Sequence, residues 1–256
     1  MNQSKILYAI SGLFIGLVVG FIFTNAVNRQ EREEMRTELA RLRATSQTKG
    51  NPPNNPSTAG NSNSSLTDED VRNVIARGDA NQNDVDLQRK IGRGFYLYAA
   101  QTGETKLLPE AVRFLQRAYA AEPNDYETTV MLGNALFDLG QASDAENFKE
   151  ARIYYLKALA IKPKDVSVRT DLGLTYYFDK PSQPERAIAE YRKSLAVDSS
   201  HEPTLQNLAT ALISIRVFDE AQQRIDELQR INPSHTALPN LRAQLAQSKN
   251  KAKEQN

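Results

Sequence analysis

The chain has 256 residues, enough for one or two domains with a sizeable core, and it contains no Cys, which excludes a disulfide framework, a thiolate zinc site and a thiol nucleophile. Its 32 Lys and Arg are balanced by 31 Asp and Glu. This balance argues against a protein that holds nucleic acid by bulk positive charge, so no nucleic-acid partner is expected.

The first predicted element is an apolar N-terminal segment. No residue from Ile6 to Asn28 is charged, and a helix of this length spans the roughly 30 Å core of a bilayer. The sequence therefore predicts a transmembrane anchor at residues 1–28. A cleaved signal peptide is the alternative, but the apolar run of about 18 residues exceeds the roughly 7–15 residues of a signal-peptide core.

The flanks and glycines of this segment bear on topology and pairing. Five Arg follow the anchor between Arg29 and Arg43, whereas only Lys5 and the α-amino group precede it, which favours a cytoplasmic C-terminal side. The periplasmic orientation is the alternative. Gly12, Gly16 and Gly20 lie on one helix face, a spacing typical of close contacts between membrane helices, and they allow a homodimer through the anchor. The general frequency of Gly in membrane helices also accounts for them.

Two segments are expected between the anchor and the folded region. Residues 29–46 read as a charged juxtamembrane helix, in which Met35, Leu39 and Leu42 form a short seam like that of a coiled coil. Residues 47–66 are rich in Asn, Ser and Pro and have almost no apolar side chains, so they predict a disordered linker.

Order is predicted to resume with a helix that begins at Thr67, where Asp70 completes a capping box, and that stops at Gly78. The polar segment that follows resembles a calcium loop only in part. Asp84 stands where that loop needs Gly, and Lys90 stands where it needs a bidentate Glu. A polar turn between two helices is the better interpretation.

From here to residue 247 the apolar spacing is helical, which indicates an all-α fold. One pattern recurs at steps of 40, 36 and 34 residues, beginning at Ala111, Ala151, Ala187 and Ala221. Four residues after each of these Ala there is a bulky residue: Leu115, Tyr155, Tyr191 or Ile225. Such a period, with two helices in each unit, is typical of a helical solenoid.

Each upstream helix carries a small residue, at which the bulky residue of the second helix is expected to pack. These positions are Gly133, Gly173 and Ala209 in the last three units, and Gly92 or Gly94 in the first. The second unit is expected to carry about six extra residues between its helices, around 142–147. The third unit is expected to carry two extra residues between its helices. Within the second unit, Tyr155 is predicted to pack between helices, and Lys157 and Lys162 to be solvated.

This pattern resembles the tetratricopeptide repeat (TPR) family, with the fourth unit closest because it carries Phe-Asp-Glu-Ala at Phe218–Ala221 and no insertion. The resemblance implies a solenoid of about four helix-turn-helix repeats over residues 67–248. A capping helix is expected from Leu238, because an open solenoid end would expose core. Residues 249–256 are expected to form a flexible tail.

The resemblance also implies a groove, lined by the first (A) helix of each repeat, that binds a protein or peptide. Projecting the family pattern gives these candidate residues: Arg89, Arg93, Tyr96, Glu127, Val130, Asn134, Phe137, Ser167, Thr170, Leu174, Tyr177, Gln206, Thr210 and Ile213. One subtype of the family grips a C-terminal carboxylate with cationic residues. Here the later positions hold Asp171, Pro203 and Asn207, which do not form such a clamp.

No catalytic, cofactor or metal residue is expected. The two histidines, His201 and His235, are a whole repeat apart, and no phosphate loop, nucleophile elbow or zincin motif is present. The predicted function is a non-enzymatic, membrane-tethered protein-binding scaffold, similar in layout to bacterial envelope-assembly factors of the inner membrane. The alternative is a structural membrane protein that self-oligomerises through its glycine-bearing anchor and its repeat surfaces.

Overall fold

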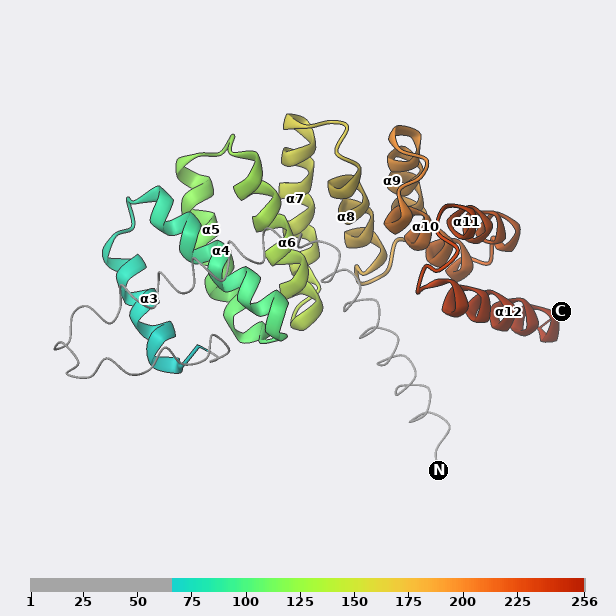
Figure 1. Ribbon diagram of the computed structural model, residues 1–256, viewed down its shortest axis with the longest axis horizontal. Helices are drawn as coiled ribbons and strands as arrows, with labels where there is room; N and C mark the ends of the chain where they lie inside the picture. Colours follow the sequence, from blue (N-terminus) through green and yellow to red (C-terminus); the bar gives the residue numbers. More distant parts are fainter. Residues whose placement is uncertain (1–65, 256) are drawn as a thin grey trace, which may run out of the picture. The chain divides into compact units, whose positions relative to one another are not determined.

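The computed structural model describes residues 66–255, which contain helices and no strand (Figure 1). The predicted anchor with Gly12, Gly16 and Gly20, the juxtamembrane helix and residues 47–65 of the linker lie outside the described residues. Within 66–255 no helix is both long and apolar enough to cross a membrane. The chain divides into two compact units, whose described parts are 66–117 (unit 1) and 118–255 (unit 2).

Unit 1 is built from α3 (Asp68–Ala80), α4 (Val85–Thr102), a 3-10 turn η1 (Thr105–Leu107) and most of α5 (Leu108–Ala121). The predicted capping box is confirmed, because the Thr67 hydroxyl accepts a hydrogen bond from the Asp70 amide and the Asp70 carboxylate accepts one from the Thr67 amide. The start of the first ordered helix is therefore encoded locally.

The predicted stop at Gly78 is wrong, because α3 continues through it to Ala80. A Cβ atom at this position would lie 2.8 Å from Ile91 Cδ1 and closer still to the Phe114 ring. Gly78 is required because the α4 and α5 side chains pack against the backbone of α3, and a helix interior tolerates Gly where such close approach is needed.

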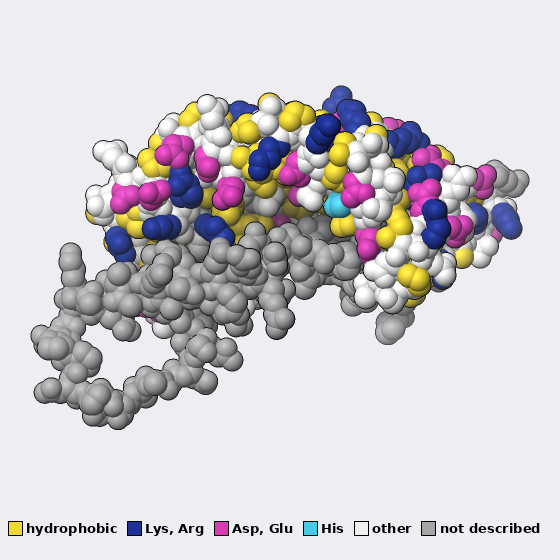
Figure 2. Space-filling view, turned by 45° about the horizontal axis from the view of Figure 1, so that its top comes forward, with side chains coloured by type: hydrophobic (Ala, Val, Ile, Leu, Met, Phe, Trp, Pro, Cys, Tyr) yellow, Lys and Arg dark blue, Asp and Glu magenta, His cyan; other side chains and the backbone are white. Residues whose placement is uncertain are grey.

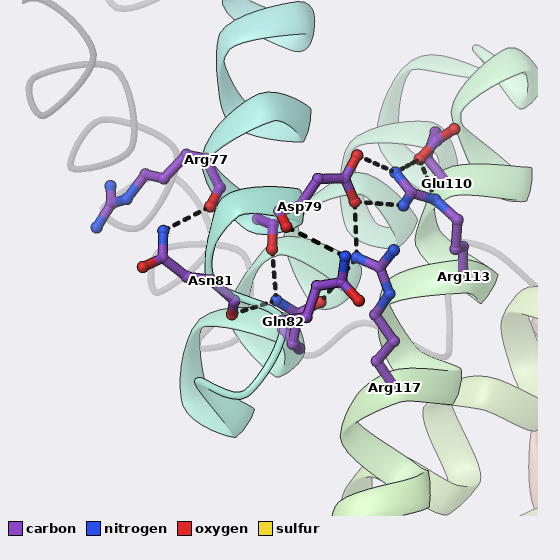
Figure 3. A network of polar contacts seen from close by, with 9 residues as sticks. Arg77, Asp79, Asn81, Gln82, Glu110, Arg113 and Arg117 are labelled. Carbon is purple, nitrogen blue, oxygen red and sulfur yellow. Dashed lines mark hydrogen bonds and ion pairs between the residues drawn. The ribbon is translucent and has the colours of Figure 1, made fainter.

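A network of ionic contacts holds the end of α3 to α5 (Figure 3). The Asp79 carboxylate accepts hydrogen bonds from Arg113 and Arg117, and Arg113 also pairs with Glu110. The hydrogen bonds from Arg113 and Arg117 lower the pKa of the Asp79 carboxyl. The polar segment that began like a calcium loop thus supplies an anion for two guanidinium groups, and Gln88 closes its turn by donating to two backbone carbonyls.

Unit 2 holds the end of α5 and three helix pairs followed by a last helix. The helices are α6 (Tyr126–Ala142), α7 (Glu146–Ile161), α8 (Val166–Tyr177), α9 (Pro184–Val197), α10 (Glu202–Ser214), α11 (Phe218–Ile231) and α12 (Leu238–Glu254). Asp125 and Asp165 begin α6 and α8 in the same way, each accepting from the backbone amide three residues on. The helix pairs agree with the predicted second, third and fourth repeats.

The predicted packing of a small residue against a bulky one is confirmed in unit 2. A Cβ atom at Gly133 would lie 2.8 Å from Tyr155 Cε1, and one at Gly173 would lie 2.8 Å from Tyr191 Cδ1. Both tyrosines are at most 1% exposed. The rings therefore lie directly on the backbone of the first helix of each pair, a contact that a larger residue would prevent.

The register of the first repeat, which the sequence left open, is set by Gly92. A Cβ atom there would lie 2.7 Å from Leu115 Cγ and 2.9 Å from the Leu115 amide nitrogen. Leu115 takes the place that the tyrosines take in the next two repeats.

The extra residues of the second repeat do not form the expected insertion between helices. They lengthen α6 to 17 and α7 to 16 residues, compared with 13 for α10 and 14 for α11, and leave only residues 143–145 as the turn. Phe148 explains this extension, because its ring packs 5.3 Å from that of Phe137 and lies on Gly140. The longer helices bury an aromatic pair that a loop would leave in solvent.

The last helix also extends further than the sequence indicated. The boundary predicted at residue 248 falls inside α12, so residues 249–254 of the expected flexible tail are helical. Lys251 and Lys253 in its last turn favour continuation, since cations stabilise a helix C-terminus. Its buried leucines face α10 and α11: Leu238, Leu241 and Leu245.

Candidate functional site

The candidate site of unit 2 lies on its A helices, α6, α8 and α10. We call the A-helix face the set of side chains on these three helices that the repeat pattern turns away from their partners α7, α9 and α11. The predicted residues of this face differ in their exposure to solvent. Glu127 and Ser167 are exposed; Val130, Asn134, Tyr177 and Thr210 are partly exposed; Phe137, Thr170, Leu174, Gln206 and Ile213 are buried.

The three candidates of unit 1 belong to α4 and are described by themselves. Arg89 is partly exposed, and its guanidinium lies 2.7 Å from the Asp86 carboxylate one turn earlier. Arg93 is also partly exposed, whereas Tyr96 is 7% exposed. Arg89 is thus partly neutralised on its own helix, so it is not a bare cation.

Phe137 lies in the core of unit 2. Its ring packs against Phe148 at 5.3 Å and against Phe178 at 6.0 Å, and the side chain is 3% exposed. Phe178 also contacts Tyr177, with ring centroids 5.4 Å apart. Phe137 therefore acts as packing for α6, α7 and the end of α8, and of this aromatic group only Tyr177 was both predicted and left partly exposed.

The Thr170 hydroxyl takes part in a chain of hydrogen bonds inside unit 2. It lies 2.6 Å from the hydroxyl of Thr204 and 3.3 Å from that of Ser194, which joins α8 to α10 and α9. Thr204 also bonds the His201 ring at 2.6 Å, and burial lowers the pKa of that imidazole. This chain gives His201 a structural role at the start of α10.

The partly exposed candidates carry hydrogen-bonding and aromatic groups. The Asn134 side-chain oxygen accepts from the Tyr155 hydroxyl at 2.9 Å, which leaves its amide nitrogen as a donor. The Thr210 hydroxyl donates to the Gln206 carbonyl at 3.0 Å and retains acceptor capacity. Burial raises the pKa of Tyr177, whose ring is the aromatic element of this face.

Two carboxylates lie on the same helices: sequence reasoning missed Asp138, and it considered Asp171 only as a position that does not fit a cationic clamp. Asp138 follows Asn134 by one helical turn on α6, and Asp171 precedes Leu174 by one turn on α8. Burial, followed by the charge of Asp165, raises the pKa of Asp171 to about 7. Burial and the charge of Asp171 raise the pKa of Asp138 well above its usual range. Helical spacing from the predicted residues was the available signal, but it does not reveal burial.

The hydroxyl of Tyr191 on α9 is buried and has no hydrogen-bond partner among the described residues. Tyr155 crosses Gly133 and bonds the following residue, Asn134, but in the next repeat Tyr191 crosses Gly173 and the following residue is the apolar Leu174. Within the described part of the chain, the Tyr191 hydroxyl has no hydrogen-bond partner. Its pKa is raised by burial and also by the charges of Tyr177 and Asp171.

Other surfaces of the described chain mix charge with apolar groups. Figure 2 shows Lys and Arg interspersed with Asp and Glu over the face in view. Lys157 on α7 and Lys162, directly after the end of this helix, are exposed as predicted, and the Lys157 ammonium nitrogen lies 4.7 Å from the Tyr119 ring centre. Ile153 and Leu156, one turn apart on the same helix, are 51% and 52% exposed. Among residues 66–255 no group of three His, Asp or Glu is placed to hold a metal ion.

Comparison with solved structures identifies the fold. MamA from Desulfovibrio magneticus is 18% identical with a TM-score of 0.53, and the likeness covers 78% of this chain and 97% of that one. A thermophilic TPR protein from Thermus thermophilus is 17% identical with a TM-score of 0.50, covering 71% of this chain and 89% of that one. The described residues have the TPR fold. At these identities the likeness concerns the fold alone.

Sequence comparison reaches less of the chain. No known family profile matches it. The type IV pilus assembly protein PilF of Pseudomonas aeruginosa is 33% identical over 81 residues, which is 32% of this chain and 31% of that protein. The match thus spans under a third of the length of this curated relative.

Proposed function

We propose that this TPR protein is a non-enzymatic, membrane-tethered scaffold whose A-helix face binds a segment of a protein partner. The observation that carries the proposal is that three successive A helices keep Asn134, Tyr177 and Thr210 partly exposed while the residues around them complete the core. An amide, a phenol ring and a hydroxyl spaced along one face match the needs of a peptide, which offers backbone donors and acceptors and apolar side chains.

The histidines support a binding role over a catalytic one. His201 is engaged with Thr204 in the chain that links α8 to α10. His235 lies in the turn before α12, where its Nδ1 atom accepts from the Ala237 amide at 3.2 Å. The His201 ring therefore serves a hydrogen-bond chain inside the repeat, and its second nitrogen lies 3.5 Å from the hydroxyl of the exposed Ser167.

The membrane tether rests on the apolar residues 1–28, and the role in assembly rests on architecture together with the partial likeness to a pilus assembly protein. A tether raises the effective concentration of the repeats at the bilayer, which strengthens capture of a partner that is also at the membrane. We favour the cytoplasmic orientation from the Arg count after the anchor. A topology reporter fused after Asn256 tests it, and a periplasmic signal would reverse the compartment from which the partner comes.

Site-specific photocrosslinking of the full chain in native membranes tests the binding face. A crosslinker placed at Asn134 or at Thr210 is expected to capture the same partner segment, identified by mass spectrometry. The matched control is Gln223, an exposed position on α11 outside the A-helix face. Capture that is equal at all three positions, or that occurs from Gln223 alone, would place binding elsewhere.

Self-assembly is the second candidate function, and the exposed pair Ile153 and Leu156 favours it, because adjacent large apolar residues on one helix commonly mark a contact surface. Light scattering of the full chain in detergent measures the oligomeric state. If repeat surfaces assemble the protein, changing both residues to Ser lowers the mass. If the anchor does so, Gly16→Leu has that effect instead. If the wild type, the double Ser variant and Gly16→Leu are all monomers, self-assembly is refuted and only the scaffold function remains.

A further inference from the structure

We propose that the exposed side of α7 docks on the surface of a bilayer that carries anionic lipid. We call the α7 face its exposed side chains Ile153, Leu156, Lys157, Ala160 and Ile161. This inference rests on the membrane tether proposed above and goes beyond it, because it gives the folded repeats a second contact with the bilayer. It assigns to lipid the apolar pair that self-assembly would otherwise use.

The first ground is the arrangement of the exposed apolar residues. Ile153 and Leu156 are three residues apart, Ala160 follows Leu156 by four, and Ile161 is 41% exposed. Residues three and four apart lie on one side of a helix, so these side chains form a continuous stripe. Single exposed apolar residues are ordinary on a protein surface, whereas a contiguous group marks a contact.

The second ground is a set of cations without counterions. Residues 151–164 include no acidic residue. Within this stretch Arg152 is paired with the buried Asp179 at 2.8 Å. Three lysines of the stretch are exposed and have no ion pair among residues 66–255: Lys157, Lys162 and Lys164. Positive charge is therefore left uncompensated along the second half of α7 and just beyond its end.

Other lysines of unit 2 differ from these three. Lys149, in the first turn of α7, lies 2.6 Å from the Glu146 carboxylate, and Lys193 on α9 lies 2.7 Å from the Glu190 carboxylate. The acidic residues of α7 itself, Glu146 and Glu150, both precede the apolar stripe. The charge of α7 is thus divided along its length, and the positive end coincides with the exposed apolar residues.

The third ground is that tyrosine rings hold two of these lysines. The Lys157 ammonium nitrogen lies 4.7 Å from the ring centre of Tyr119 and 5.0 Å from that of Tyr154, and these rings meet edge to face at 5.1 Å. The Lys162 ammonium nitrogen lies 3.7 Å from the ring centre of Tyr126. A ring face orients a cation without cancelling its charge, as a carboxylate would. All three rings are partly exposed.

Exposed aliphatic residues beside lysines and tyrosines match the boundary between lipid headgroups and acyl chains. Aliphatic side chains enter this boundary, and tyrosine rings favour it because they are apolar with a polar end. Lysine stems lie along the apolar region while their ammonium groups reach the lipid phosphates. The α7 face therefore complements an anionic bilayer in both polarity and charge.

An acidic, amphipathic segment of another protein would offer a similar complement, but the tether favours lipid. The linker predicted at residues 47–66 would span about 25 Å on average if flexible. A domain held at this distance meets lipid at a high effective concentration, whereas a partner must first arrive. A weak surface contact is therefore sufficient for lipid docking.

The test uses a single introduced Trp as the probe, because the chain contains none. The full chain carrying Leu156→Trp is placed in nanodiscs, one copy to a disc, so that a second copy cannot cover the face. The lipid is phosphatidylcholine, alone or mixed with anionic phosphatidylglycerol, with or without bromine on the acyl chains. Ile231→Trp, at the exposed apolar end of α11, is the matched control.

In discs with anionic lipid, the Leu156→Trp emission is expected to shift to the blue and to be quenched by brominated acyl chains. Neutral lipid or high sodium chloride should largely abolish both effects, because the attraction is electrostatic and is screened by salt. Ile231→Trp should stay unquenched throughout. Equal quenching at the two positions, or no quenching at Leu156→Trp, would overturn the proposal.

Substitutions in the Leu156→Trp chain make the assignment specific. Lys157→Gln and Lys162→Gln should each weaken docking about fivefold, as expected for one Lys near an anionic surface. Lys251→Gln, the same change at an exposed position of α12, should have little effect. Ile153→Ser should weaken docking about tenfold because less apolar surface enters the bilayer. Equal effects of all three Lys changes would show attraction by net charge and would refute docking through α7.

Two other occupants would give different results. A blue shift without bromine quenching would show that another segment of this chain covers the α7 face, which refutes lipid docking. A photocrosslinker at Ala160 of the full chain in native membranes is expected to form lipid adducts. Protein adducts without lipid adducts would overturn the proposal in favour of a protein partner.

Failure of the tether is distinguishable from failure of docking. A chain that does not enter neutral nanodiscs refutes the anchor at residues 1–28, and quenching of the same Trp variants by brominated anionic vesicles then decides the docking. A chain that enters the discs but shows no quenching at Leu156→Trp refutes docking alone. Capture of a partner from Asn134 and Thr210 is independent of both outcomes.

Discussion

Replacing Asp171 by Asn should change the stability of the protein in a pH-dependent way. The Asp171 pKa is about 7 in the folded chain, against an ordinary value of 3.8. A difference of three pKa units corresponds to about 4 kcal/mol at 1.36 kcal/mol per unit. Because the side chain is partly exposed, solvent screening reduces this to about 2 kcal/mol.

The sign of the effect follows from proton binding. Between about pH 4 and pH 7 the folded chain keeps the Asp171 proton while the unfolded chain releases it, so the free energy of unfolding falls as the pH rises through this window. Above pH 7 the loss is complete. Asn cannot ionise, so Asp171→Asn should match the wild type near pH 4 and exceed it by about 2 kcal/mol at pH 8.

Urea unfolding of the full chain in nonionic detergent, followed by circular dichroism across this pH range, measures the difference. Asp138→Asn should act in the same direction, since burial also raises the pKa of that carboxyl. Asp219→Asn, an exposed change on α11, is the matched control and should leave the pH profile unchanged. If Asp171→Asn is less stable than the wild type at pH 8, then Asp171 has a stabilising partner and the account of an uncompensated carboxylate is refuted.

Three further predictions concern packing. Tyr155→Phe should lower the free energy of unfolding by about 1 kcal/mol because it loses its bond to Asn134, whereas Tyr191→Phe should be neutral or stabilising because its hydroxyl has no partner in the described chain. Equal losses in urea titrations would contradict this. Gly173→Ala should cost about 1–3 kcal/mol, measured by the shift in melting temperature, because Tyr191 occupies the space of the new methyl group. Phe137→Ala should lower the free energy of unfolding by about 3–5 kcal/mol, because it empties a space in the core. Its melting temperature should fall, and partner binding should persist below that temperature. Binding that is lost while the variant is still folded would contradict a core role.

Much of the fold is predictable because each repeat is defined by contacts over short sequence distances. The step between units and the pairing of a small residue with a bulky one indicated the helix pairs, and Gly133 with Tyr155 bears this out. Solenoid repeats are recognisable in this way because each one contacts only its neighbours. The ends of the elements were less predictable: α3 passes through Gly78, and α12 continues to Glu254. Both differences arise because a glycine can end a helix or lie inside one, and a polar run can be a flexible tail or the continuation of a helix.

The candidate site was predicted only in part. Family positions led to Asn134, Tyr177 and Thr210, which remain partly exposed, but also to Phe137 and Thr170, which the core uses. The pattern assigns a residue to a helix face, whereas burial depends on what arrives from the adjacent repeat. Phe148 and Phe178 enclose Phe137, and neither is its sequence neighbour.

The sequence by itself determined the all-α repeat, the pairing of its helices and the residues at their close contacts, because a period of 34–40 residues and the size of single side chains are local properties. Only the tertiary structure decided which side chains of the A helices stay exposed to solvent and which are buried in the core. It alone brought Asp138 of α6 close enough to be affected by the charge of Asp171 on α8, and left the Tyr191 hydroxyl without a hydrogen-bond partner among the described residues. The physical reason is that desolvation and charge compensation depend on every group in the neighbourhood, and most of these groups are remote in sequence.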